Sequence, residues 1–496
     1  MAFLFNLGKQ SVDERQPVFN LRAWVLDQFL RPRMNTSAGY AVLIAAAMVV
    51  SAMIGRGGWP TAVMLTVAIV VVPLLLATLL QVRLGLYLIV ALGFLVPFLK
   101  RLDHTMPYTL LIDATLGMMV LGVFIKQIYP RDWSFARTPV LLAVAVWLGY
   151  CLFQLVNPSL SSGLAWLYSV RSLGGYWLLV LVGLFALQRE KTIRGWLHFL
   201  LGASTLVALY GLWQYSNGFQ LFELSWLYRN PEQFRDVIGE SSFRIFSVLT
   251  TPGAFGITMA IGSILALSFA VEKRRTTIER ALFWGATWLM LTGVLLSGSR
   301  TAFVMVPVGY SFLILLTWQR EVALVGLGLG MLWLALMVAP IESPLIKRVQ
   351  YTFDSAKGVL LPQGGDNQDF VQPYIQSHPV GSGIGSTGEG GQLFSPHTLL
   401  SQFPPNSGFV QVAVETGWIG LLLYTSSLLL MLWVAVKVSL RLPKGSREQS
   451  LAAALTSLLV MLVVAHYPQK ALLNLPTTLI FPLAVAAVVN LGRMKR

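Results

Sequence analysis

The sequence predicts an all-α, polytopic transmembrane helical bundle, and three observations support this prediction. The chain of 496 residues is 55% hydrophobic and only 11% charged, with a mean hydropathy of +0.68. Water-soluble domains of ordinary size cannot bury that much apolar surface. Many apolar runs reach the roughly 20 residues that a membrane-crossing helix needs. Basic residues lie in small groups between these runs, as expected for the ends of membrane spans.

Fourteen apolar runs are candidate spans, and about 12–14 are expected to cross the membrane. The run near residues 84–99 is short, and the last run is interrupted by Pro476 and Pro482, so these two are the weakest candidates. The runs start near residues 38, 61, 84, 109, 138, 173, 196, 251, 281, 301, 322, 408, 451 and 472.

The basic residues orient the bundle. With fourteen spans and a cytoplasmic N-terminus, 24 of the 36 Lys and Arg residues fall on the cytoplasmic side, although the outer loops are longer. The reverse orientation inverts this bias, which contradicts the positive-inside tendency. Both termini are therefore expected in the cytoplasm. The formal net charge of +15 is spread between apolar runs, so it indicates topology and membrane lipids rather than a nucleic-acid partner.

This topology divides the chain into six segments, two of which are long loops on the outer side. Loops of such length are usually functional. The longer one is rich in Gly, Pro, Ser and Gln and is predicted to be irregular. The segments are a cytoplasmic N-terminal segment (1–37), N-terminal spans (38–213), an outer loop (214–250), central spans (251–340), a long outer loop (341–407), and C-terminal spans with a short cytoplasmic tail (408–496).

Three arginines precede spans that run inward from the outer face: Arg171, Arg244 and Arg300. All three are therefore expected at helix N-termini, where unpaired amide hydrogens favour anions. A guanidinium group adds a planar fork that fits phosphate oxygens. Thr251 followed by Pro252 predicts a capped helix start at the same face. Together these groups could hold a diphosphate, whereas each arginine alone could equally anchor a lipid headgroup.

Titratable side chains on the same side are candidates for proton transfer. His378 and His397 lie in the long outer loop, where a near-neutral imidazole could accept a hydroxyl proton or simply make a loop hydrogen bond. Asp113 lies near the outer end of the fourth predicted span and Glu415 early in the twelfth. Acids within spans suggest function, and capping or interhelical hydrogen bonding is the alternative.

Several site classes are excluded or unexpected. Cys151 is the only cysteine, so an intramolecular disulfide or a cysteine-based metal site cannot form. The sequence contains no nucleotide-binding loop, zinc pattern or hydrolase elbow. An ATP-driven pump is therefore not expected, and neither is a cofactor or a metal.

Short motifs in a fixed order carry a resemblance over residues 165–435. Arg244-Ile-Phe-Ser precedes a span, Ser297-Gly-Ser-Arg follows, residues 378–385 read His-Pro-Val-Gly-Ser-Gly-Ile-Gly, and residues 405–420 contain Pro-Asn-Ser-Gly-Phe and Glu-Thr-Gly-Trp. In this order the chain resembles the superfamily of O-antigen ligases and Wzy-type O-antigen polymerases.

The resemblance implies a bacterial inner-membrane glycosyltransferase of the GT-C type. Members act without metal on undecaprenyl-diphosphate-linked glycans at the periplasmic face, in the synthesis of lipopolysaccharide O-antigen, capsule or exopolysaccharide. Arg171, Arg244 and Arg300 would then bind the diphosphate, with Arg171 the weakest match. The resemblance also allows for a polysaccharide-assembly or chain-length partner.

One departure from the family pattern concerns the catalytic base. The ligases commonly have a His-Asn pair where this chain has Pro405-Asn406. His397, eight residues upstream, is the first substitute, and Glu389 or Glu415 are the others. Contacts to the glycan or within the loop are expected from three further residues, His378, Asn406 and Asp113. The electrostatics of the arginines could also suffice without a base. The departure favours a polymerase, or another capsule or exopolysaccharide enzyme, over a lipid A core ligase.

Two other classes of function stay open. The same spans could form a transporter or flippase, since one branch that resembles this superfamily is linked to inorganic-carbon uptake. Carriers usually have paired halves or broken central helices with buried charges, and the sequence has little of either. A non-catalytic scaffold of an envelope polysaccharide complex, with the long loop binding a partner, is the third alternative.

Overall fold

The computed structural model describes residues 71–103, 106–237, 243–272, 275–318, 320–338, 372–403 and 405–494, with scattered residues between 41 and 55. The N-terminal segment 1–37, most of the first two predicted spans and residues 339–371 of the long outer loop lie outside the described residues. The chain forms two compact units, residues 1–85 and 86–496. The second unit carries every candidate site residue and is the subject below.

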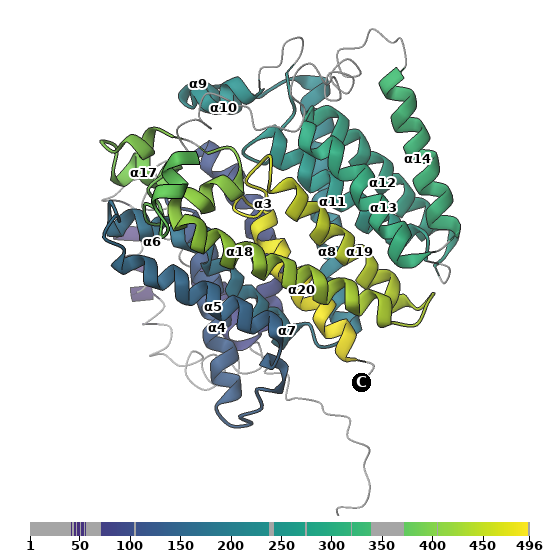
Figure 1. The fold of residues 1–496 in the computed structure, drawn as a ribbon, viewed down its shortest axis with the longest axis horizontal. Helices are drawn as coiled ribbons and strands as arrows, with labels where there is room; N and C mark the ends of the chain where they lie inside the picture. The colour runs from purple at the N-terminus through teal and green to yellow at the C-terminus, as the bar shows by residue number, and fades with distance from the viewer. Residues whose placement is uncertain are drawn as a thin grey trace, which may run out of the picture. The chain divides into compact units, whose positions relative to one another are not determined.

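The described residues are almost entirely helical, and no β-strand occurs among them (Figure 1). The longer helices are α3 (Val82–Leu102), α4 (Thr109–Gln127), α5 (Pro139–Phe153), α6 (Gly163–Leu173), α7 (Leu179–Ala186), α8 (Glu190–Asn217), α11 (Pro252–Ala270), α12 (Thr277–Ser297), α13 (Arg300–Thr317), α14 (Arg320–Val338), α18 (Gly408–Arg441), α19 (Arg447–Ala465) and α20 (Thr477–Arg493). Three further short helices lie in the segments between the spans: α9 (Leu221–Arg229), α10 (Pro231–Val237) and α17 (Gly388–Phe394).

Nine helices of the described part are long and apolar enough to cross a membrane, or ten if the bent pair formed by 163–173 and 175–186 is one span. The chain is therefore a multi-pass membrane protein. The run near residue 84, predicted as a weak span, is a full 21-residue helix, α3. The last span is shorter than predicted, because α20 begins only after Pro476 and has 17 residues.

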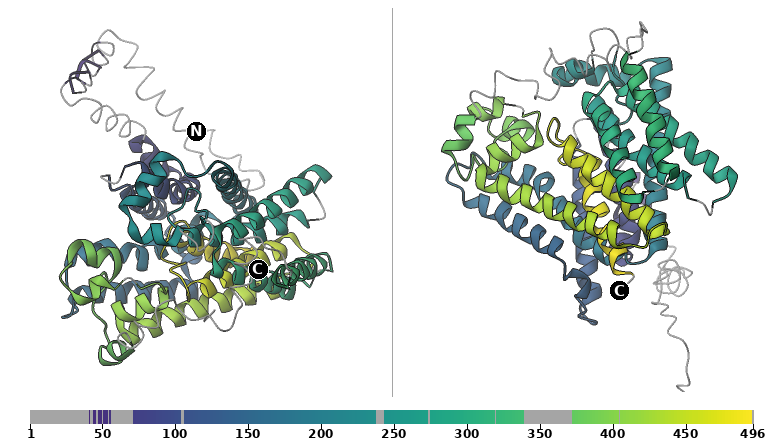
Figure 2. Two further views of the ribbon diagram at one scale, coloured as in Figure 1. Left: turned by 90° about the horizontal axis from the view of Figure 1, so that it is seen from above. Right: turned by 45° about the vertical axis from the view of Figure 1, so that its right-hand side comes forward.

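The core of this unit forms around α11, whose residues are almost wholly buried (Figures 1 and 2). Helices α8, α12, α13 and α19 pack against it. Small residues allow these close approaches: a Cβ on Gly256 would lie 2.5 Å from Ser297 Oγ, and one on Gly309 would lie 2.2 Å from Met461 Sδ. The packing fixes both ends of α11 relative to its neighbours.

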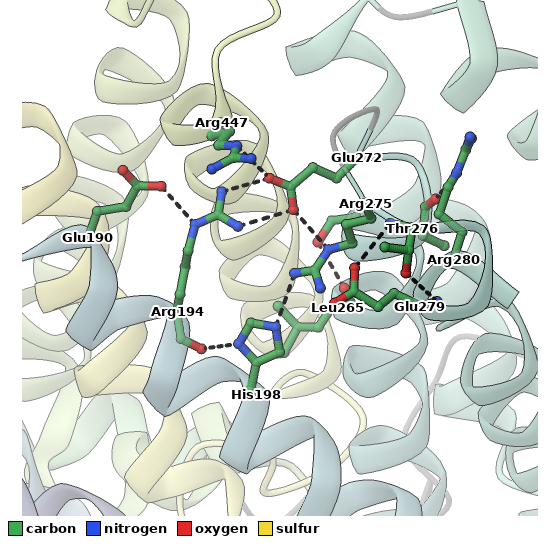
Figure 3. A network of polar contacts seen from close by, with 12 residues as sticks. Glu190, Arg194, His198, Leu265, Glu272, Arg275, Thr276, Glu279, Arg280 and Arg447 are labelled. Carbon is green, nitrogen blue, oxygen red and sulfur yellow. Dashed lines mark hydrogen bonds and ion pairs between the residues drawn. The ribbon is translucent and has the colours of Figure 1, made fainter. Parts of the chain in front are cut away.

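At one end of the bundle, Glu272 accepts from three arginines (Figure 3). Arg194 binds both of its oxygens at 3.1 and 3.0 Å, and Arg275 and Arg447 each approach to 3.0 Å. Arg194 also pairs with Glu190 at 2.7 Å. This Glu272 network joins segments whose basic residues are predicted to share the cytoplasmic side, and the structure places them at one end.

The two segments predicted as outer loops are not wholly irregular. The segment 214–250 contains α9 and α10, and the described part of 341–407 contains α17 and the 3-10 turn Leu399–Gln402. Helix α9 begins with a capping box, in which Gln220 and Glu223 exchange hydrogen bonds with each other's backbone. These helices lie at the end of the bundle opposite the Glu272 network (Figure 1).

Candidate functional site

The closely spaced glycines of residues 378–388 allow a close backbone contact with α18. Helix α18 is interrupted at Gly417, which has φ 71°. The amide of Ser382 donates to Val414 O at 3.0 Å, and that of Gly383 donates to Glu415 O at 2.9 Å. A Cβ on Gly417 would lie 2.1 Å from Pro379 O. The glycine-rich segment, residues 378–388, is therefore docked into the kink of α18 by backbone pairing.

The buried carboxylate of Glu415 holds the glycine-rich segment by hydrogen bonds. Its side chain is fully buried, and Oε1 accepts from Thr387 Oγ1 at 2.5 Å and from Gln411 Nε2 at 3.2 Å. Its Oε2 accepts from the amide of Gly385 at 3.1 Å. A buried carboxylate held by three donors has little access to a substrate hydroxyl. Its position therefore favours an anchoring role over the proton transfer considered from the sequence.

The opposite flank of the glycine-rich segment is held by the end of α5 and the turn after it. Gln154 Nε2 donates to Val380 O at 2.9 Å, and Asn157 Nδ2 donates to Gly381 O at 3.2 Å. Both side chains are buried. The segment is thus fixed on two sides before any substrate binds.

Arg171 does not lie at a helix N-terminus, which corrects the sequence prediction. Helix α6 starts at Gly163, with Ser162 as its N-cap, so Arg171 falls in the last turn. Its Nη1 pairs with Asp113 Oδ2 at 3.1 Å, and its guanidinium lies 4.3 Å from the ring centre of Tyr168. Asp113 therefore serves as the partner of Arg171.

Tyr168 links Arg171 to Glu389. The Tyr168 hydroxyl donates to Glu389 Oε2 at 2.9 Å. Glu389 lies in the first turn of α17 and its side chain is exposed. Unlike Glu415, this carboxylate has one described hydrogen bond and a free face. Glu389 is thus a candidate base that is accessible to a substrate and is oriented by the Tyr168 hydroxyl.

The turn between α19 and α20 adds a cation that the sequence analysis missed. Lys470 Nζ lies 3.8 Å from the position of a Cβ on Gly388, directly before Glu389. The lysine is partly exposed. Burial lowers the pKa of Lys470, and the charges of Glu415, Glu389 and Glu232 oppose this by raising it. The available signal in the sequence was the place of Lys470 in the short segment between the last two apolar runs.

The same turn reaches the start of α13. Gln469 Nε2 donates to Ser299 Oγ at 3.3 Å, and Ser299 is the N-cap residue before Arg300. A Cβ on Gly253 would lie 2.4 Å from Gln469 Oε1, so Gln469 also touches the start of α11. There the predicted cap is present, because Thr251 Oγ1 accepts from the amide of Ala254 at 3.1 Å. Arg300 is the first residue of α13, as predicted.

Arg244 lies eight residues before α11 rather than in its first turn. The next amide, of Ile245, donates to Leu296 O at 3.2 Å, at the end of α12. Only the short turn after α12 separates Leu296 from Arg300. Burial raises the pKa of Asp236, and so does the negative charge of Glu232, whereas the positive charge of Arg244 opposes this rise. Arg244 and Arg300 are therefore on neighbouring segments at the same end of the bundle.

The remaining predicted residues lie at the edge of this arrangement. The ring of His378 stacks on Tyr374 at 4.1 Å between centres, and its Nδ1 lies 3.0 Å from Tyr374 O. His397 is exposed and makes no hydrogen bond or ring contact with the described residues. Asn406 is exposed, two residues before α18.

Buried polar side chains also join the helices at the site end of the bundle, and the sequence analysis did not identify them. Arg101 Nη1 donates to Ser247 O at 2.6 Å and lies 3.5 Å from Glu223 Oε1, with both charged side chains fully buried. Glu223 also accepts from Gln214 Nε2 at 2.9 Å. This pair ties α9 and the segment before α11 to α3.

The candidate site thus consists of Arg171, Tyr168, Glu389, Lys470, Arg300 and Arg244. Direct contacts join Arg171, Tyr168 and Glu389, and contacts made by adjacent residues bring Lys470, Arg300 and Arg244 to the same end of the bundle. Within the described residues no group of three or more His, Cys, Asp or Glu side chains could hold a metal ion. Its cationic side chains and amide-rich helix starts can bind an anion, and Glu389 can accept a proton.

Comparison with known protein families and with curated proteins gave no match for this chain.

Proposed function

We propose that this protein is a membrane glycosyltransferase that polymerises or ligates glycan units carried on undecaprenyl diphosphate, at the periplasmic face of a bacterial inner membrane. The observation that carries the proposal is the linked set of cations and one accessible carboxylate at the end of the bundle opposite the Glu272 network. A lipid-linked diphosphate brings its anionic group to this depth, at the boundary between apolar helices and polar loops.

Arg244 and Arg300 are proposed to hold the diphosphate. Arg300 is the first residue of α13, whose amide hydrogens add to the attraction for an anion. Arg244 lies on the segment that pairs through the Ile245 amide with the end of α12, next to this helix start. Arg171 already pairs with Asp113 and stacks on Tyr168, so its proposed part is to orient the Tyr168 hydroxyl toward Glu389. This divides the three arginines into two that bind substrate and one that positions a neighbour.

In the proposed reaction, the acceptor hydroxyl oxygen attacks the anomeric carbon of the lipid-linked sugar. The bond between that carbon and the phosphate oxygen breaks, and its electron pair leaves with the diphosphate. Glu389 takes the hydroxyl proton. Fixed donors that face the departing diphosphate stabilise the charge that grows on it, and one such donor is typically worth about 10²–10³-fold in rate.

Glu389 replaces His397 as the first candidate base in this proposal. The support is that Glu389 is oriented by Tyr168 and lies beside the cations, whereas His397 has no described contact. We expect Glu389→Gln to abolish product and His397→Ala to keep most of it. If His397→Ala abolishes product and Glu389→Gln does not, the base is His397.

The proposal is tested by replacing Arg300 and a matched arginine. Arg320 is also the first residue of a helix, α14, but is predicted at the cytoplasmic side. Purified protein is supplied with undecaprenyl-diphosphate-linked oligosaccharide, and chain elongation or released undecaprenyl diphosphate is measured. Arg300→Ala should lower turnover at least about 100-fold, and Arg320→Ala should leave it unchanged. Equal turnover by both variants contradicts the proposal.

A further inference from the structure

Lys470 is a cation whose pKa is lowered by burial and raised in opposition by the charges of three carboxylates, none of which pairs with it among the described residues. Glu415, Glu389 and Glu232 come from three different elements, α18, α17 and α10, and all act on its charge. Among the described residues none forms an ion pair or a hydrogen bond with the ammonium group. Glu415 is fully engaged by Thr387, Gln411 and Gly385, and Glu389 accepts from Tyr168. The ammonium group of Lys470 can therefore donate hydrogen bonds to a ligand.

The turn that carries Lys470 is rigidly built. His466 Nδ1 accepts from the amide of Leu472 at 3.1 Å, and its Nε2 lies 3.1 Å from the Tyr424 hydroxyl. The amide of Gly408 donates to His466 O at 3.1 Å, and a Cβ on Gly408 would lie 1.9 Å from the ring. Gln469 then bridges to the N-cap of α13. These contacts hold residue 470 between α17 and the start of α13.

Several other basic side chains, unlike Lys470, have a partner close by. Arg194 and Arg275 share Glu272, and Lys437 Nζ lies 4.1 Å from the centre of the Trp433 ring. Leaving an ammonium half-buried and unpaired lowers stability unless a ligand supplies the missing anion. Such a cost is typical of groups kept for function.

We propose that Lys470 is a substrate-binding residue that donates to a phosphate oxygen of the lipid diphosphate, between the base Glu389 and Arg300. This inference rests on the proposed function for the identity of the anion. The lysine lies beside Gly388 on one side and is joined through Gln469 to Ser299 on the other. From this place it would neutralise the charge that develops when the sugar–phosphate bond breaks, while Glu389 accepts the acceptor proton.

The lowered pKa of Lys470 gives the proposal a signature in pH. Binding that needs the ammonium form falls as pH rises through the pKa of Lys470, which lies below the ordinary lysine value of about 10.4. In Lys470→Arg the cation is permanent, and the alkaline fall should disappear.

The experiment measures binding of undecaprenyl diphosphate alone to the purified protein in nanodiscs, from pH 7 upward, with thermal unfolding of each variant. Lys470→Gln should weaken binding about ten- to a hundredfold without lowering the melting temperature, and Lys470→Arg should bind within a few-fold of the parent. Lys437→Gln, on α18 and roughly 33 Å along the helix from Glu415, is the matched control and should bind normally.

The outcomes separate this inference from the proposed function. Unchanged binding by Lys470→Gln, or a melting temperature that falls in step with binding, overturns the role of Lys470. Absence of binding by the parent protein also overturns it. Binding that needs Lys470 in a protein that never turns over lipid-linked glycan supports the site and contradicts the glycosyltransferase.

Discussion

Helices α11, α12 and α19 each have one end in the Glu272 network and the other at the candidate site, so the two ends can be compared within the same elements. At the first end, Glu272 is 11% exposed and binds three arginines directly. At the second end, Lys470 and Arg300 form no ion pair among the described residues, and Glu389 keeps an open face. Paired charges of this kind hold helices together, whereas unpaired cations beside helix starts are available to an anion.

The backbone also differs between the two ends of the bundle, because the helices begin regularly at one end and a helix is interrupted at the other. The network end uses ordinary helix starts, such as the capping box of Thr276 and Glu279 on α12. The site end uses an interrupted helix, with Gly417 and Gly381 both at positive φ and in mutual contact. Gly445, near the network end, also has a positive φ, but a Cβ there would meet no atom within 4 Å, whereas Gly417 and Gly381 bring two separate segments into contact. The comparison therefore assigns stability to one end and binding to the other.

The largest effect is expected from Gly417→Ala at the site end. The new Cβ would meet Pro379 O at 2.1 Å, and the positive φ disfavours any residue with a side chain. Strain and overpacking together should lower the free energy of unfolding by about 3 kcal/mol and displace the glycine-rich segment. Turnover per folded molecule should fall as well. Thermal unfolding and the glycan assay measure the two effects, and Gly445→Ala, at positive φ in open space, controls for backbone strain alone.

Glu272→Gln tests the network end. Removing this carboxylate leaves three arginines without their shared partner, and should lower the free energy of unfolding by about 2–3 kcal/mol because the group is largely buried. Binding of undecaprenyl diphosphate by the folded fraction should not change. A normal melting temperature with lost ligand binding would reverse the roles that the comparison gives to the two ends.

The third prediction concerns the loss of stability at low pH through His466, which holds the turn that carries Lys470. Burial lowers the pKa of His466 to about 3, whereas the unfolded chain has the ordinary value of about 6.5. The unfolded state therefore binds a proton first, so stability is lost as pH falls below about 6.5, by about 2 kcal/mol at pH 5. His466→Gln, whose amide can serve both Leu472 and Tyr424, should lose less stability over that range. A parallel pH dependence for the two proteins contradicts this role.

Arg447→Ala should have the smallest effect. Its side chain is 45% exposed, and Glu272 keeps Arg194 and Arg275 when it is removed. Solvent screens such a pair, so the free energy of unfolding should fall by less than about 1 kcal/mol. A loss as large as that of Glu272→Gln would show that the network depends on all three arginines equally.

Much of the fold was predictable from the apolar runs, because lipid requires long helices with their backbone groups satisfied internally. The cap at Thr251 followed from Thr before Pro, and it is present. Arg171 was misplaced because the start of α6, Gly163-Leu-Ala-Trp-Leu-Tyr, is less apolar than the run after it, and a search for apolar runs begins too late. The bend after α6 divides one expected span in two.

The candidate site was less predictable, because its contacts join residues far apart in the chain. Nothing in the sequence around Lys470 reveals that the turn after α19 reaches Gly388, or that Gln469 binds the cap of α13. Helix α17, in the long outer loop, was missed because a Gly- and Pro-rich composition conceals short elements. The capping pattern of Gln220 and Glu223 was the local signal for α9.

The central claim is that the cations at the site end bind a lipid-linked diphosphate for glycosyl transfer. Its most direct test is turnover of undecaprenyl-diphosphate-linked oligosaccharide by the purified protein, the Arg300→Ala variant and the Arg320→Ala control. The account predicts longer lipid-linked chains, or release of undecaprenyl diphosphate when a second acceptor is supplied, from the parent and the control but not from Arg300→Ala. No turnover of any of several such glycans by the parent protein would contradict it and favour transport or scaffolding.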